Sequence, residues 1–233
     1  MKLRDGLPGA EASGKAPSSI LENNDAGIVK MAEINTKMEI QMLLPGNAPI
    51  SCYPIPDGCH IRNYASEADR QTWARVVRAA EKYHSVIDEA LHIQQFKDDV
   101  ESLALRQFFL CNAAGEEVGT ATAWFDSEYR GLRWGRFHWL SIVPEYQGRG
   151  LAKPLISYTL NALKSMGHER VRLTTEHLRT QAISIYLKFG FLPDVTKEGH
   201  LAVWKGLQKD GMKIDKACIF ENGRINSKDF TLF

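Results

Sequence analysis

The stretch from Ile142 to Ala152 constrains this chain most, because it joins an apolar strand to a helix through a loop with two glycines. The apolar run ends at Pro144, and Gly148 and Gly150 lie directly before a helical pattern. The first amides of a helix have no partner inside the helix and carry a partial positive charge. Glycine lets the backbone approach a ligand closely. We therefore expect residues 147–153 to bind a phosphate or a pyrophosphate.

Two cations support this expectation, since Arg149 and Lys153 belong to the same segment. Pro154 fits the first turn of the following helix, where its missing N–H needs no partner. The segment is not a Walker loop, because Gly-Lys-Ser/Thr is missing, and it lacks the third glycine of the dinucleotide fingerprint. An ordinary strand-to-helix turn that uses glycine for its geometry stays open as the alternative.

The hydrophobic pattern on either side of this loop predicts one α/β domain. Helices are expected over residues 67–83, 85–100, 150–166 and 181–189. Strands are expected over residues 59–64, 107–111, 118–125, 134–143, 170–175 and 200–204. The resulting order is strand, two helices, three strands, then helix, strand, helix and strand. This order favours an α+β mixed sheet that is covered by helices.

Both ends of the chain extend beyond this pattern, and we expect the domain itself to span residues 57–207. The N-terminal extension, residues 1–56, begins with a flexible stretch rich in glycine, serine, alanine and charge. Within it, Met38 to Leu44 can form a strand or a helical turn that covers a sheet edge or joins a dimer. The C-terminal tail, residues 208–233, contains the hairpin signal Asn222-Gly223.

Composition narrows the possible functions. The 233 residues include 29 Lys or Arg and 28 Asp or Glu, so the net charge of +1 gives no general attraction to nucleic acid or to an anionic membrane. No apolar run approaches the roughly 20 residues of a membrane helix, and no export signal is visible, so we expect a cytoplasmic monomer or homodimer. The four cysteines form no C-x-x-C pair, and we expect free thiols and no metal site.

The loop resembles the acyl-CoA-binding motif of the GNAT N-acetyltransferase superfamily, in which Gln or Arg is followed after two residues by Gly and, two positions on, by Gly or Ala. Gln147, Gly150 and Ala152 fill these fixed positions. The hydrophobic strand and the proline before the loop also match. The resemblance implies the GNAT fold, with acetyl-CoA as the acyl donor.

A second signature of the superfamily, A-x-x-x-Y-x-x-x-G-F, is matched downstream. Ala182, Tyr186, Gly190 and Phe191 fill its positions. The whole resemblance covers about Cys59 to Lys205, and the two signatures occur in the order that the superfamily has.

The resemblance also implies a cofactor site. Backbone groups of Leu140 and Ile142 would pair with the pantetheine arm where two strands separate, and amides from Gly148 to Lys153 would hold the pyrophosphate. The full implied set is Leu140, Ile142, Gln147, Gly148, Arg149, Gly150, Leu151, Ala152, Lys153, Arg179 and Tyr186. Arg179 departs from the superfamily, which often has Asn three residues before the Ala.

Acyl transfer to an amine needs an oxyanion donor and an acid for the leaving thiolate. We expect the backbone amide of Ile142 to be the oxyanion donor. Tyr186 is expected to be the general acid, because a phenol is protonated at neutral pH. Half-buried packing on an apolar helix stripe is the alternative for Tyr186.

The general base has two candidates, His138 and Glu176. His138 lies four residues before Ile142, and the two-residue period of a strand places it on the face of Leu140 and Ile142. Its position resembles that of a histidine in arylalkylamine N-acetyltransferases. Glu176 is the rival, because some protein acetyltransferases of the superfamily carry a catalytic Glu near this strand end. A hydrogen-bonded histidine among aromatics and a solvated carboxylate are the structural alternatives.

We therefore predict an N-acetyltransferase that transfers an acetyl group from acetyl-CoA to a primary amine of a small molecule or a peptide by direct attack. A catalytically idle CoA-binding regulatory protein is the alternative, and the presence of Tyr186 favours the enzyme. A phosphate-binding module unrelated to CoA is a third possibility, against which the second signature argues.

Overall fold

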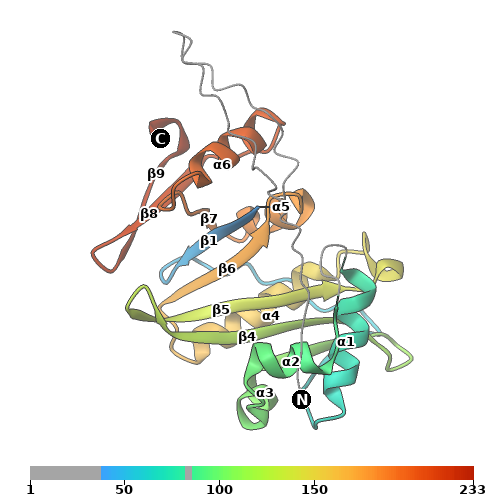
Figure 1. Ribbon diagram of the computed structural model, residues 1–233. Coiled ribbons are helices and arrows are strands. Elements are labelled where there is room, and N and C mark those ends of the chain that lie inside the picture. The colour runs from blue at the N-terminus through green and yellow to red at the C-terminus, as the bar shows by residue number, and fades with distance from the viewer. Residues whose placement is uncertain (1–37, 82–85) are drawn as a thin grey trace, which may run out of the picture. The chain divides into compact units, whose positions relative to one another are not determined.

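A computed structural model describes residues 38–81 and 86–233, so the stretch expected to be flexible lies outside the described residues. The centre of the fold is a seven-stranded sheet in the order β2-β3-β4-β5-β6-β1-β7 (Figure 1). Its strands are β1 (Glu39–Pro45), β2 (His60–Asn63), β3 (Gln107–Cys111), β4 (Glu117–Tyr129), β5 (Leu132–Ile142), β6 (Arg170–Glu176) and β7 (Leu192–Pro193). β5 and β6 run parallel, whereas the other neighbouring strands run antiparallel. The mixed sheet expected from the sequence is confirmed.

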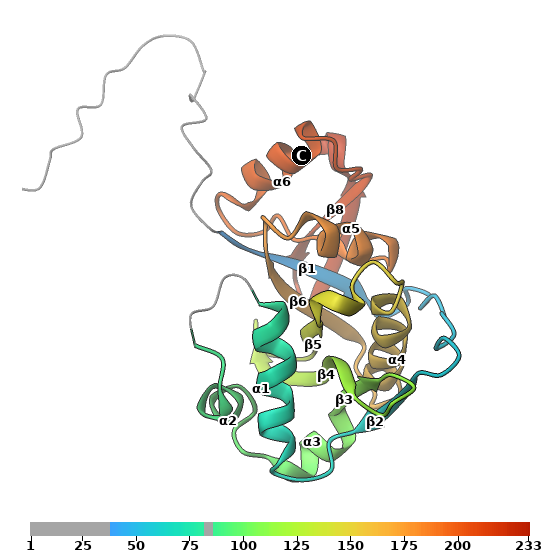
Figure 2. The same ribbon diagram turned by 90° about the vertical axis from the view of Figure 1, so that its right-hand side faces the viewer.

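Helices cover both faces of this sheet. They are α1 (Asp69–Ala80), α2 (Glu89–Phe96), α3 (Val100–Arg106), α4 (Ala152–Ser165), α5 (Thr180–Lys188) and α6 (His200–Lys209). Figure 2 shows α1 and α4 on opposite sides of β3, β4 and β5. Leu155 and Leu160 of α4 are fully buried against one face, and Trp73 of α1 and Phe96 of α2 are fully buried with Phe109 on the other.

β1 lies inside the sheet although it comes first in the chain. It pairs with β6 from Glu39 opposite Glu176 to Pro45 opposite Arg170, and with β7 through Met42 opposite Pro193. An interior strand has both faces covered, and its apolar run from Met42 to Leu44 is buried accordingly. The segment expected to be a strand or a turn is therefore a strand, and it lies between two others.

The prediction of a strand over residues 200–204 is wrong, because this segment belongs to α6. Gly199 has φ 80° directly before the helix, and His200, Val203, Trp204 and Leu207 are buried. Buried positions spaced three and four apart are helical, and a window of five residues is too short to show that period.

The helix expected over residues 85–100 is divided in the structure. Lys97 and Asp98 adopt φ values of 56° and 55°, which a continuous right-handed helix does not allow. Asp99 then caps α3, because its side chain accepts a hydrogen bond from the amide of Ser102 at 2.9 Å. The helix expected over residues 67–83 appears as α1, and residues 82–85 lie outside the described residues.

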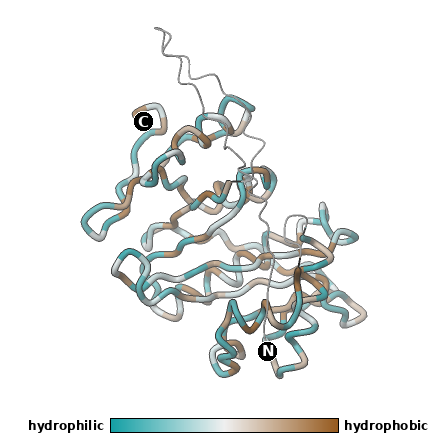
Figure 3. Tube along the Cα trace, in the orientation of Figure 1, coloured by the Kyte–Doolittle hydropathy of each residue, from teal (hydrophilic) through white to brown (hydrophobic). Residues whose placement is uncertain are grey.

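The C-terminal tail forms a hairpin of β8 (Lys216–Glu221) and β9 (Arg224–Asp229). Asn222 and Gly223 at its turn have φ values of 50° and 75°, as a type I′ turn requires. The turn is hydrophilic (Figure 3), whereas Cys218 of β8 is buried with Leu43 and Trp134 of the sheet. None of the described helices is both long enough and apolar enough to cross a membrane.

Candidate active site

The site begins where β5 and β6 separate. The two strands pair at Gly135 opposite Val171 and at Arg136 opposite Arg172, after which the described residues show no further pairing between them. Trp139 has φ 51°, and the β4–β5 register shifts between Thr120 and Thr122, so β5 carries a bulge. A bulge bends the strand that contains it, and this one lies at Trp139, three residues beyond the last pair at Arg136.

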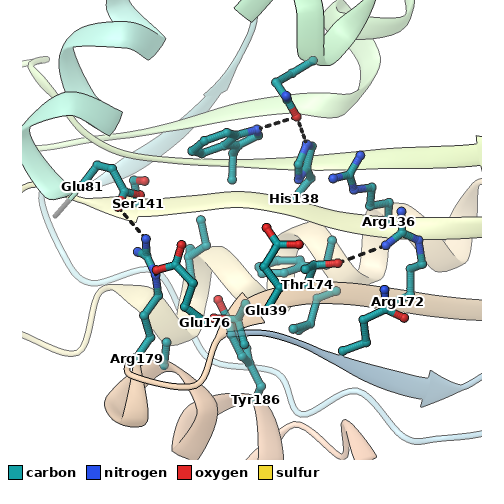
Figure 4. Close-up of a pocket in the computed structure, with 18 of the residues that line it drawn as sticks. Glu39, Glu81, Arg136, His138, Ser141, Arg172, Thr174, Glu176, Arg179 and Tyr186 are labelled. Carbon is teal, nitrogen blue, oxygen red and sulfur yellow. Dashed lines mark hydrogen bonds and ion pairs between the residues drawn. The ribbon is translucent and has the colours of Figure 1, made fainter. Parts of the chain in front are cut away.

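A cavity of about 480 Å³ occupies this opening. Its lining comes from β1, β4, β5, β6, α2, α5 and the end of α1 (Figure 4). The lining includes Glu39, Gln41, Glu81, Gln95, Arg136, His138, Leu140, Ser141, Arg172, Thr174, Glu176, Arg179, Ala182 and Tyr186. The structure therefore brings both candidate bases and the candidate acid to one cavity.

The bulge overturns the expectation that His138 shares a face with Leu140 and Ile142. Leu140 and Ile142 pack with the core cluster that includes α4. The His138 ring contacts Phe96 of α2, with 5.7 Å between ring centroids, and Trp139, with 5.6 Å. The extra residue of the bulge interrupts the two-residue alternation, so His138 lies on the face of α2.

His138 is oriented by a side chain that the sequence did not indicate. Its Nε2 lies 3.0 Å from Gln95 Oε1, and Trp139 Nε1 donates to the same oxygen at 3.3 Å. Because a carboxamide oxygen accepts, His138 carries its proton on Nε2 and leaves Nδ1 unprotonated. Burial, followed by the charges of Arg136 and Arg172, lowers the pKa of His138 well below its usual 6.5. The ring is therefore neutral at neutral pH.

Tyr186 approaches the cavity from α5. Its ring is buried and packs against Phe137 and Phe191, with centroid distances of 5.9 and 6.0 Å. Burial raises its pKa to about 12, while the Arg179 charge opposes that shift. The phenol therefore keeps its proton at neutral pH and can donate it.

Glu176 and Arg179 belong to an ion-pair network at one end of the cavity. Arg179 Nε lies 2.9 Å from Glu176 Oε2, and Arg179 Nη2 lies 2.5 Å from Glu81 Oε1. Both carboxylate side chains are 5% exposed. The rival base is thus a buried, ion-paired carboxylate, not the solvated one considered as its alternative.

The backbone amide of Ile142 points away from β4. The amide of Val143 donates to the carbonyl of Val118 at 2.9 Å, and Ile142 is the next residue, opposite Gly119. Hydrogen-bonded and non-hydrogen-bonded pairs alternate along an antiparallel ladder, so the Ile142 N–H faces the side of β6. The Ile142 carbonyl accepts a hydrogen bond from Gln147 Nε2 at 2.8 Å, which ties the loop to the strand.

The glycine loop follows the short 3₁₀ turn Pro144–Tyr146 and leads into α4. Gly148 and Gly150 have φ values of 75° and 80°, and no atom of the described residues lies within 4 Å of where a Cβ would stand on either glycine. The described residues offer no acceptor for the amides of residues 148–150. Residues 147–153 are not among those that line the cavity, so the loop and the cavity are two separate parts of the site.

Sequence reasoning missed the polar lining of the cavity apart from His138, Glu176, Arg179 and the hydroxyl of Tyr186. Arg136 had a usable signal, because it alternates with His138 on a strand. Glu39 and Gln95 had none, since their place depends on β1 joining the sheet and on α2 lying over β5.

Comparisons with known proteins place the chain in a family. Residues 73–191 match the Acetyltransferase (GNAT) family. A mycothiol acetyltransferase of Streptomyces griseus is 29% identical over 140 residues, which cover 59% of this chain and 44% of that protein. A mycothiol acetyltransferase of Nocardia farcinica is 31% identical over 150 residues, which cover 60% and 47%. The chain spans about half the length of these curated relatives.

The fold has counterparts among solved structures. A GCN5-related N-acetyltransferase from Sphaerobacter thermophilus superposes with a TM-score of 0.57 at 17% identity, covering 67% of this chain and 48% of that chain. The family match spans half of the chain, and the loop, the bulge and the separated strands lie inside it. The chain belongs to the GNAT acetyltransferase family.

GNAT acetyltransferases use acetyl-CoA as a co-substrate, and the residues present fit this molecule. Within the part of the chain that the structure describes, the loop offers amides without partners and open space above its glycines, and it carries the cations Arg149 and Lys153. Helix N-termini with such amides bind phosphate groups. Among the described residues, no group of three or more His, Cys, Asp or Glu side chains could hold a metal ion.

Proposed function

We propose that this protein is an N-acetyltransferase that transfers the acetyl group of acetyl-CoA to a primary amine of a small molecule. The observation that carries the proposal is the convergence of His138 and Tyr186 on one cavity, beside a strand opening and a glycine loop typical of the family. The curated relatives are named for mycothiol, and from this likeness we infer a small-molecule acceptor in preference to a peptide.

Each residue has a role in the proposed reaction. The amides of residues 148–153 hold the pyrophosphate, and Leu140 and Ile142 present backbone groups to the pantetheine arm. The amine nitrogen attacks the thioester carbon while His138 takes the amine proton, with Glu176 as the rival for this role. The Ile142 amide stabilises the oxyanion, and Tyr186 protonates the sulfur as the carbon–sulfur bond breaks.

Calorimetric titration with acetyl-CoA tests the proposal directly, with adenosine diphosphate as a control for the nucleotide part. We expect binding that requires the pantetheine arm, followed by CoA release when amines are added. Acetyl-CoA binding without acetylation of any amine would instead favour the catalytically idle regulator.

The Gly150→Ala variant is expected to bind acetyl-CoA about tenfold more weakly. An L-residue at a φ of 80° is strained by roughly 1–2 kcal/mol, and relief of that strain turns the loop amides away from the pyrophosphate. The measurement is the dissociation constant from calorimetry.

Gly167→Ala is the matched control, because Gly167 lies just beyond the other end of α4 with φ 78° and equally open space. Both variants should lose similar thermal stability, and Gly167→Ala should bind acetyl-CoA as the unchanged protein does. Equal affinities for the two variants would remove the loop from the cofactor site.

The identity of the base is tested by pH–rate profiles. Because the pKa of His138 is lowered below 6.5, kcat at saturating amine and acetyl-CoA should stay constant as the pH falls through 6.5 and should decline at more acidic pH. His138→Gln should lower kcat on the order of a hundredfold and abolish that acidic limb. If Glu176→Gln loses the acidic limb of the pH–rate profile and His138→Gln retains it, Glu176 and not His138 is the general base.

A further inference from the structure

The two ends of the cavity carry different charged groups. Glu81, Glu176 and Arg179 lie at one end, and Arg136 and Arg172 lie at the other, where β5 and β6 still pair (Figure 4). Like charges directly opposite each other on paired strands destabilise a sheet. The second end therefore holds a pair of cations at an energetic cost.

Arg172 is fully engaged by the protein. Its Nε donates to Asp126 Oδ2 at 2.6 Å, its Nη1 donates to Thr174 Oγ1 at 3.2 Å, and its guanidinium lies 4.3 Å from the centre of the Tyr129 ring. The carboxylate of Asp126 therefore forms its short ion pair with Arg172.

The guanidinium of Arg136 has fewer polar partners than that of Arg172 among the described residues. Among the described residues its guanidinium donates no hydrogen bond, its buried Nε has no partner, and its ion pair is a 4.0 Å contact between Nη1 and Asp126 Oδ1. The side chain is 23% exposed, so water cannot fully solvate it. Burial and then the Arg172 charge lower the pKa of Arg136, with Asp126 and Glu39 opposing that shift. A partly buried cation without such partners is costly unless a ligand supplies them.

We infer that Arg136 anchors a carboxylate of the acceptor, so that the substrate is an amine with a carboxylate at the far end of a short carbon chain. This inference rests on the proposed function, because it assigns a chemical class to the acceptor. A guanidinium matches a carboxylate with two parallel hydrogen bonds. A singly charged carboxylate fits beside Arg136 better than a phosphate dianion, because the negative charges of Asp126 and Glu39 lie near the same guanidinium and repel a dianion more strongly.

The spacing between amine and carboxylate follows from β5. Arg136 and His138 both precede the bulge and lie on the same side of the strand. Because they are two residues apart, their Cα atoms are separated by about 7 Å along the strand. The extended chain of 6-aminohexanoate spans a similar length between its amine and its carboxylate. The acceptor therefore has its carboxylate at Arg136 and its amine beside His138.

The test compares 6-aminohexanoate with hexylamine, which has the same carbon chain and no carboxylate. The kcat/KM for 6-aminohexanoate should exceed that for hexylamine by roughly 10- to 100-fold, the range expected for a charge-assisted hydrogen-bonded pair. Arg136→Gln should bring this ratio close to one. Arg133→Gln, an exposed arginine on the same strand outside the cavity, should keep it. Equal rates with both amines, or a ratio that survives Arg136→Gln in a folded variant, would overturn the inference.

A binding experiment separates this inference from the proposed function. Hexanoate titrated calorimetrically into the protein saturated with CoA should bind, and Arg136→Gln should weaken that binding about tenfold or more. If no amine is acetylated but hexanoate binding still depends on Arg136, the role of Arg136 as a carboxylate anchor is supported and the proposed enzyme activity is contradicted. If amines are acetylated and hexanoate binding is unchanged in Arg136→Gln, the proposed enzyme activity is supported and the role of Arg136 as a carboxylate anchor is contradicted.

Discussion

Tyr186→Phe is expected to lower kcat about a hundredfold and to leave the KM for acetyl-CoA unchanged. The variant keeps the ring that packs against Phe137 and Phe191, so the cavity wall should stay in place. What it removes is a buried hydroxyl that holds its proton because its pKa is about 12. A positioned proton donor contributes on the order of 10²–10⁴ in rate, and an interaction made in the transition state alone affects kcat and not KM. Initial rates of CoA release over a range of acetyl-CoA concentrations give both constants.

Tyr158→Phe provides the control for this experiment. Tyr158 lies on α4, is 40% exposed and does not line the cavity. Its variant should keep the kcat of the unchanged protein. A Tyr186→Phe enzyme with normal kcat would show that Tyr186 has the packing role considered as its alternative.

Met42→Ala is expected to reduce the free energy of unfolding by about 2–5 kcal/mol, the range for truncating a fully buried side chain. Met42 is 0% exposed and lies at the middle of β1, opposite Leu173 of β6 and Pro193 of β7. Loss of its contacts leaves a cavity between two strands that close packing cannot easily refill. Urea titration followed by linear extrapolation measures the difference.

Met38→Ala makes the same chemical change at the exposed start of the segment, where Met38 is 39% exposed. It should alter stability by less than about 0.5 kcal/mol, as surface substitutions usually do. Similar losses for the two variants would argue that residues 39–45 are not an interior part of the sheet.

Most of the fold could be predicted from the sequence, because each long element has its own period. The strand over residues 134–143, the helix over residues 150–166 and the turn at Asn222-Gly223 all depend on local patterns, and all appear in the structure. Residues 200–204 were mistaken for a strand because the helical period becomes visible over ten residues, as His200, Val203, Trp204 and Leu207 show.

The candidate site was predictable in part, for a similar reason. The loop and Tyr186 belong to contiguous signatures, so their neighbourhood is encoded locally. The position of His138 was not, because a bulge at Trp139 changes which side chains share a face, and no glycine marks it. The cavity lining from Glu39 and Gln95 depends on tertiary pairing of distant segments, which a single sequence does not reveal.

The place of β1 has a consequence for how the protein is made. Met42 pairs with Leu173, which is 131 residues later in the chain, so β1 leaves the ribosome long before its partners exist. At a synthesis rate of about 5–20 residues per second, the wait is on the order of ten seconds. During that time an apolar segment has no sheet to join, and it is exposed to chaperones and to pairing with other chains. The same strand supplies Glu39 and Gln41 to the cavity, so the cavity is completed late, when the first described residues close over the last strands of the sheet.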